Sequence, residues 1–278
     1  MSDDPQRFKI SARASPIFFL HNPKAGGSSL RSVFEELFPQ EQVAPVFSNA
    51  PHDHRNNGSA LRDQRGFAFY AGHYGYDAYR QLRDGHSLVT NFRDPVERIV
   101  SLYRYWRNNV RAEDLVDLDP RDAAIVMLAK ELDFAAFIRC DDQDLRLYTS
   151  NFHFRQLYRS GWTNLSIGRW HMVVVKRRIA RMKWFYVAEL PHISSMLLRH
   201  CFGDLAASKI PTVNNSGGPS IKVCQPDADH IIRNNVADYE IFYHALRVQN
   251  DRFRRLNSKL SRNNGKGSEL SLPHPAKG

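Results

Sequence analysis

The stretch Ile17-Phe18-Phe19-Leu20-His21-Asn22-Pro23-Lys24-Ala25-Gly26-Gly27-Ser28-Ser29 decides the fold, because a strand pattern gives way within it to a turn and then to a helix. The apolar run 17–20 predicts a short buried strand. Pro23 and the pair Gly26-Gly27 interrupt the pattern. From Ser28 onward apolar residues recur at offsets of three and four, which predicts an amphipathic helix that is capped by Ser28 and ended by Pro39.

A second strand, turn and helix are predicted around Arg93-Asp94-Pro95. The run Ser87–Phe92 is apolar enough for a buried strand, and Asp94 before Pro95 is typical of a helix start. Further strands are predicted at 67–71 and 184–187, and further helices at 121–160 with a break near 149–151, after Pro191 to about Phe202, and at 237–260. This alternation favours an α/β fold with a mainly parallel sheet flanked by helices.

The chain shows no internal repeat and no clear linker. We therefore expect a single domain over residues 16–260, with a flexible segment at 1–15 and a polar, disordered tail at 261–278. The stretch 49–66, rich in Asn, Asp, His, Arg and Gly, is expected to be an exposed loop, and so is 212–219.

Composition limits the class of protein. With 42% hydrophobic residues in 278, a wholly disordered chain is excluded, and the net charge of +10 favours anionic partners. Three widely spaced cysteines suggest neither a disulfide framework nor a zinc site. No secretory leader and no run of about 18 apolar residues is visible. We expect a soluble, cytoplasmic protein without a transmembrane segment.

The loop between the first strand and helix has the features of an anion cradle. Glycines let the backbone approach an anion, and a helix start directs free N–H groups at it. Lys24 adds a mobile charge, and Ser28 and Ser29 add hydroxyl donors. This is not a Walker A loop, whose lysine follows the last glycine. A plain glycine turn with a solvated lysine is the alternative.

Arg93 and Ser101 form a second candidate anion site. Arg93 follows a predicted parallel strand, at the sheet edge where such folds usually bind ligands. Ser101 lies about two helical turns further on, on the same side as Arg98 and Tyr105. A guanidinium fork and a hydroxyl could together hold one phosphate. A helix start with ordinary surface arginines is the alternative.

Taken together, the strand–PKAGGSS–helix unit, Gly72-His73, and Arg93-Asp94-Pro95-x-x-Arg98-x-x-Ser101-x-Tyr103 resemble the PAPS-dependent carbohydrate sulfotransferases. The likeness is greatest to the heparan 2-O-sulfotransferase-like branch and its bacterial relatives. It covers roughly residues 16–110 and is weaker at 151–161 and 187–198. The resemblance implies a P-loop-like, mainly parallel sheet flanked by helices, the sulfotransferase fold.

The resemblance also implies roles for individual residues. The 5′-phosphosulfate of PAPS would be bound by Pro23, Lys24, Ala25, Gly26, Gly27, Ser28 and Ser29. Arg93 and Ser101 would bind its 3′-phosphate, and His73 would be the catalytic base. Lys24 would neutralise charge on the departing phosphate of adenosine 3′,5′-bisphosphate, and no metal would be required. The family loop commonly contains Pro-Lys-x-Ala-Gly-Thr-Ser, so the sequence does not decide which serine contacts the donor.

The acceptor is expected to be a hydroxyl of a glycan or a small molecule. Arg155 and Tyr74 are the candidate acceptor contacts, and His21 is a competing candidate for the base. No nucleic-acid partner is expected, and the oligomeric state is not predicted. Three other functions stay open: an ATP-dependent kinase with an unusual P-loop, a non-catalytic polyanion-binding protein that uses the basic helix near 247–262, and a sulfotransferase that binds the donor without turnover.

Overall fold

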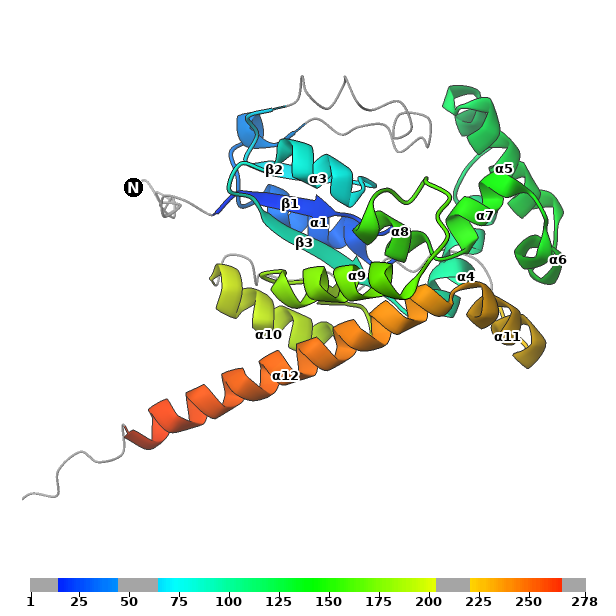
Figure 1. Ribbon diagram of the computed structural model, residues 1–278. Helices are drawn as coiled ribbons and strands as arrows, with labels where there is room; N and C mark the ends of the chain where they lie inside the picture. The colour runs from blue at the N-terminus through cyan, green and yellow to red at the C-terminus, as the bar shows by residue number, and fades with distance from the viewer. Residues whose placement is uncertain (1–14, 45–64, 204–220, 267–278) are drawn as a thin grey trace, which may run out of the picture.

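The computed structural model describes residues 15–44, 65–203 and 221–266. Its sheet contains β1 (Ile17–Leu20), β2 (Phe69–Gly72), β3 (Ser87–Phe92) and β4 (Tyr186–Val187). The strands are all parallel and lie in the order β2-β1-β3-β4 (Figure 1). The predicted α/β class with a parallel sheet flanked by helices is thus confirmed.

Helices pack against this sheet or against one another beside it. They are α1 (Gly27–Glu35), α3 (Tyr76–Leu82), α4 (Pro95–Asn108), α5 (Pro120–Glu131), α6 (Phe134–Arg139), α7 (Gln143–Thr149), α8 (Phe152–Tyr158), α9 (Arg169–Arg181), α10 (Pro191–Phe202), α11 (Gln225–Asn234) and α12 (Val236–Lys266). Two short 3-10 turns, at Gln40–Gln42 and Glu113–Asp117, complete the regular structure of the described residues.

Both faces of the sheet are buried, which explains why its strands are continuous apolar runs. Alternate residues of β1 enter opposite layers. Phe18 and Leu20 belong to the hydrophobic cluster shared with α3, α8, α9 and α12. Ile17 and Phe19 belong to the cluster shared with α1 and α10. A third cluster, rich in aromatic residues, joins α4 to α5, α6, α7 and α11 beside the sheet.

The start of α1 differs from the prediction. Gly26 rather than Ser28 is the N-cap residue, with a left-handed backbone at φ +80°, and no side chain caps the helix. The chain therefore turns into the helix earlier than the serine signal suggested, because glycine adopts this conformation without the penalty that a Cβ imposes. By contrast, Asp94 is the N-cap of α4 as predicted, since its Oδ1 accepts from the N–H of Val96.

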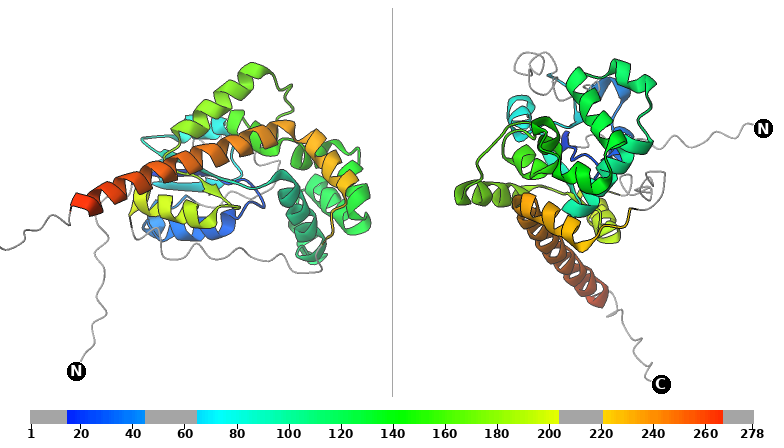
Figure 2. Two further views of the ribbon diagram at one scale, coloured as in Figure 1. Left: turned by 90° about the horizontal axis from the view of Figure 1, so that it is seen from below. Right: turned by 90° about the vertical axis from the view of Figure 1, so that its right-hand side faces the viewer.

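The long helix α12 crosses α8, α9 and α10, and its C-terminal part projects away from the sheet (Figures 1 and 2). It runs to Lys266, past the predicted end at Leu260. The first part of the predicted disordered tail, 261–266, is therefore helical. The remainder of that tail, the segment 1–14, and the predicted loops at 49–64 and 212–219 lie outside the described residues. Among the described helices, none has both the length and the apolar character that crossing a membrane requires.

Candidate functional site

The loop between β1 and α1 lies at the carboxyl edge of the sheet and is tightly turned. Lys24 has φ +63° and Gly26 has φ +80°. A left-handed conformation costs a non-glycine residue about 1–2 kcal/mol, so contacts elsewhere must hold Lys24 in it. Pro23 and Ala25 are buried, Ser29 is half-buried and Ser28 is exposed.

Asn91, near the end of β3, fixes part of this loop through its side chain. Its Oδ1 accepts from the backbone N–H of Asn22 at 2.8 Å, and its Nδ2 donates to the carbonyls of Asn22 and Ala25 at 2.9 and 3.0 Å. Both asparagines are almost fully buried. The sequence interpretation missed Asn91, although a lone amide inside the apolar run 87–92 was a signal that could have found it.

Arg93 joins the same loop to the start of α4. Its Nη1 donates to the carbonyl of Lys24 at 3.1 Å, and its Nη2 lies 3.3 Å from Glu97 Oε2. The Lys24 ammonium lies 3.8 Å from the ring centroid of Tyr105, one turn beyond Ser101 on α4. The loop therefore faces the helix that carries the second predicted anion site.

The closeness of these cations changes the acid–base chemistry of the loop. Burial, followed by the charge of Arg93, lowers the pKa of Lys24 to about 8. An anion placed between Lys24 and Arg93 would relieve their repulsion. Ser101 is buried and Arg93 is partly exposed, so Arg93 is the more accessible member of the second predicted site.

His73 follows β2 and reaches the same edge of the sheet. Its half-buried ring has its centroid 4.9 Å from that of His21, which directly precedes the loop. The His21 ring fills the space beside Gly27, where a Cβ would lie 2.0 Å from His21 Cδ2. Burial, then the charges of Lys24 and Arg31, lower the pKa of His21 to about 3, so His21 is neutral near pH 7.

Two candidate acceptor contacts lie elsewhere. Arg155 is buried, and its guanidinium donates to the carbonyls of Leu147, Ser150 and Gly161. Tyr74 is buried with its ring 5.4 Å from that of Phe18, and burial raises its pKa. These positions favour roles in the fold, so neither residue supports the expected contact with an acceptor.

Arg98 also differs from the expectation of a polar surface shared with Ser101 and Tyr105. It is buried, donates to the carbonyl of Tyr148 at 2.9 Å, and is balanced by the buried Asp238 of α12. Asp238 in turn accepts from the backbone N–H of Phe154 at 2.7 Å. Arg98 and Asp238 together therefore link α4 and α12 to α7 and α8.

The residues that come together are thus Lys24 with its loop, Arg93 with the start of α4, and His73 with His21. Across residues 15–44, 65–203 and 221–266, no group of three or more His, Cys, Asp or Glu side chains is arranged to hold a metal ion. No protein-family model matches this chain, and no curated protein matches it.

Proposed function

We propose that this chain is a sulfotransferase that moves the sulfuryl group of PAPS to a hydroxyl acceptor. The observation that carries the proposal is the contact of Arg93 with the carbonyl of Lys24. It makes the loop and the start of α4 neighbours, so one nucleotide with phosphates at both the 5′ and 3′ positions could contact both.

The donor fits the chemistry of these two groups. Backbone N–H groups at the start of α1 are free to face an anion, and Lys24 adds a charge beside them. Gly27 has no side chain that could cover these groups, and the His21 ring lies where its Cβ would be. Arg93 offers a guanidinium for the second phosphate. We also propose that the loop between β1 and α1 is a P-loop-like phosphate-binding loop.

His73 would act on the acceptor. In the proposed step its ring takes the proton of the acceptor hydroxyl while the new oxygen–sulfur bond forms and the bond from sulfur to the 5′-phosphate oxygen breaks. Lys24 would stabilise the negative charge that the departing phosphate gains. The acceptor that we propose is a carbohydrate or another glycoconjugate hydroxyl.

Thermal unfolding with nucleotides tests the donor half of this proposal. Adenosine 3′,5′-bisphosphate at about 100 times its Kd should stabilise the fold by about 2.7 kcal/mol, and AMP and ATP far less. Equal stabilisation by all three would count against the proposal, and stabilisation by ATP that needs Mg²⁺ would favour a kinase. Radiolabelled PAPS with a panel of glycans, glycolipids and small alcohols then tests transfer.

A further inference from the structure

The positive charge of this chain is concentrated in two stretches, 169–183 and 236–266. Of the 39 Lys and Arg residues 13 lie there, against 3 of the 29 Asp and Glu residues, and the remaining 26 of each kind balance. The whole surplus of ten positive charges therefore belongs to α9, the two residues after it, and α12. A surplus gathered in this way attracts an anionic partner to one part of the surface.

Helices α9 and α12 lie side by side and run in the same direction (Figure 1). The Lys176 ammonium of α9 pairs with the carboxylate of Glu240 on α12. Further along both helices, Arg252 donates to the carbonyls of Ala180 and Met182 at 3.0 and 2.7 Å. Two basic stretches that are far apart in the sequence therefore form neighbouring parts of one surface.

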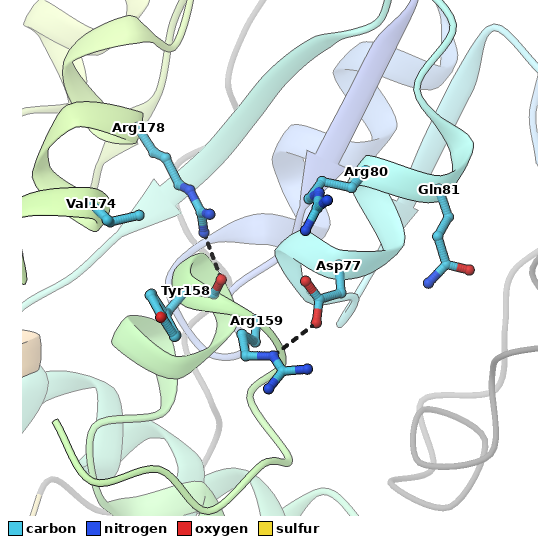
Figure 3. Close-up of a pocket in the computed structure, with 7 residues that line it drawn as sticks. All are labelled: Asp77, Arg80, Gln81, Tyr158, Arg159, Val174 and Arg178. Carbon is cyan, nitrogen blue, oxygen red and sulfur yellow. Dashed lines mark hydrogen bonds and ion pairs between the residues drawn. The ribbon is translucent and has the colours of Figure 1, made fainter. Parts of the chain in front are cut away.

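The inner side of α9 is fixed to the rest of the fold. Arg178 donates from Nη1 to the carbonyls of Leu157 and Tyr158 at 2.7 and 2.6 Å, and Figure 3 shows this side chain pointing from α9 towards the end of α8. Val175 and Ile179 are buried on the same helix. Because these contacts hold α9 in place, its exposed side is a rigid surface beside α12.

The exposed side of the two helices is basic. We call it the α9–α12 face and define it by its exposed cations, which are Arg177, Arg181, Arg247, Arg254, Arg255 and Lys259. Among the described residues of these helices, the exposed acidic ones are Glu240, which pairs with Lys176, and Asp251. The face therefore keeps a strong positive surplus after its own ion pair is counted.

Apolar side chains are exposed between these cations. Trp170 and Val173 on α9 are 67% and 39% exposed, and Tyr243 on α12 is 55% exposed. Val173 lies four residues before Arg177, and Tyr243 lies four residues before Arg247, so each pair is adjacent on its helix surface. The partner of this face must therefore offer both negative charge and apolar surface.

An anionic lipid bilayer matches both kinds of side chain. Its phosphate headgroups attract Lys and Arg, each of which strengthens binding by about fivefold near the surface. Tryptophan and tyrosine prefer the boundary between headgroups and acyl chains, and an aliphatic side chain beside them reaches the apolar side of that boundary. A nucleic-acid duplex offers phosphates along its backbone but no acyl layer for the exposed Trp170 and Val173.

We propose that the α9–α12 face docks this protein on the surface of an anionic membrane. Trp170 and Tyr243 lie at the headgroup boundary in the docked state, and the six cations contact the lipid phosphates. This inference does not depend on the proposed sulfotransferase function, because Lys24, His73 and Arg93 all lie outside α9 and α12.

Vesicle sedimentation with the full chain tests the partner. Vesicles of three parts phosphatidylcholine to one part phosphatidylglycerol should carry the protein into the pellet, and vesicles of phosphatidylcholine alone should not. Raising NaCl from about 0.1 M to about 1 M should weaken the binding, because the Debye length falls from about 10 Å to about 3 Å. Equal sedimentation with both kinds of vesicle, or with neither, overturns the inference. Binding of a DNA duplex without binding of the anionic vesicles also overturns it.

Tryptophan fluorescence locates the docked face. Of the four tryptophans, Trp170 is exposed, whereas Trp106, Trp162 and Trp184 are buried. Anionic vesicles should therefore shift the emission to shorter wavelength through Trp170, and lipids brominated on their acyl chains should quench it. Both changes should disappear in Trp170→Phe. Sedimentation of the unaltered chain without any change in emission would mean that another face docks, and would overturn the assignment.

A matched pair of double variants tests the cations. Arg247→Glu with Arg254→Glu reverses two charges of the α9–α12 face, whereas Arg111→Glu with Arg121→Glu reverses two exposed arginines outside it. The first should weaken binding to the anionic vesicles by at least about 25-fold, because two contacts of about fivefold each are lost. The second should bind nearly as well as the unaltered chain. Equal weakening in both would indicate a response to net charge alone and would overturn the inference.

Discussion

Asn91 holds Asn22 by a reciprocal pair of hydrogen bonds, with its Oδ1 accepting from the Asn22 N–H and its Nδ2 donating to the Asn22 carbonyl. The register of the sheet explains this pairing, because Leu20 of β1 lies beside Thr90 of β3. Asn91 is therefore the first residue of β3 beyond that pair, next to the point where the chain leaves β1. Beyond β1 the backbone of Asn22 has no hydrogen bonds from a neighbouring strand, and the buried Asn91 side chain provides them instead.

Replacing Asn91 should disrupt the loop more than an ordinary buried substitution. Asn91→Asp keeps the acceptor for Asn22 but puts a carboxylate oxygen against the carbonyls of Asn22 and Ala25. We expect a loss of stability of about 3 kcal/mol and loss of adenosine 3′,5′-bisphosphate binding. Urea denaturation and calorimetric titration measure the two effects.

Thr90→Val is the matched control for Asn91. Thr90 is the preceding residue of β3, and its Oγ1 donates to the carbonyl of Leu20 in the neighbouring strand β1 at 2.7 Å. This variant should lose stability while keeping its affinity for the bisphosphate. If Asn91→Asp also keeps that affinity, the amide does not organise the proposed donor site.

Gly27 and His21 should be energetically coupled. Gly27→Ala places a Cβ 2.0 Å from His21 Cδ2, and we expect the displaced ring to cost about 1–3 kcal/mol. In the double variant with His21→Ala the space is open, and alanine favours the helix over glycine. Urea denaturation should therefore show that the double variant loses less stability than the two single variants lose in total.

Gly168→Ala serves as the control for Gly27. The nearest atom to a Cβ at Gly168, His171 Nδ1, is 3.9 Å away, so this substitution causes no clash. Additive losses at Gly27 and His21 would mean that the ring does not fill the space beside the glycine in solution.

Much of the fold follows from patterns that are local in the sequence. The runs 17–20 and 87–92 are strands as predicted, and Asp94 with Pro95 starts α4. The shared location of Lys24 and Arg93 was also predictable, because each follows a parallel strand and such strands end at one edge of a sheet.

What could not be predicted depends on contacts between distant segments. The burial of Arg155 results from carbonyls that α7 and the segment after α8 supply, and its sequence neighbours do not reveal them. The helix α9 was missed because its basic residues obscure a narrow apolar stripe formed by Met172, Val175 and Ile179. Arg178 in that helix is satisfied by the end of α8.

His73 and Arg93 should affect different steps of the proposed reaction. His73→Ala should lower kcat by about 10²–10⁴-fold and leave bisphosphate affinity nearly intact, because a base acts on the acceptor. Arg93→Ala should weaken bisphosphate binding by about 10- to 100-fold. Arg111→Ala, which breaks an exposed pair with Glu113, is the control and should change neither quantity. Full turnover by His73→Ala would show that another group is the base.

The buried His153 should make the fold sensitive to acid. Burial, then the charge of Arg98, lower its pKa to about 3, so the folded protein keeps it neutral while the unfolded chain takes up a proton below about pH 6.5. Stability is therefore lost as the pH falls from 6.5 towards 3, and at pH 5 the loss is about 2 kcal/mol. In urea denaturation, His153→Gln should flatten this pH dependence, whereas His192→Gln on the exposed surface of α10 should not.

Lys24 should make donor binding depend on pH above neutrality. Its pKa of about 8 in the free protein should rise when an anion binds beside it, because the anion favours the charged ammonium. Affinity for adenosine 3′,5′-bisphosphate should be fully present below pH 8 and should fall by up to about tenfold per pH unit above it. The phosphates themselves are fully ionised there, since their second pKa is about 6.

Titrations in buffers of different ionisation enthalpy should show proton uptake on binding between about pH 8 and pH 9.5. Lys24→Arg keeps its charge over this range and should abolish both the uptake and the decline. An unchanged decline in Lys24→Arg would mean that another group in the site carries the titrating proton.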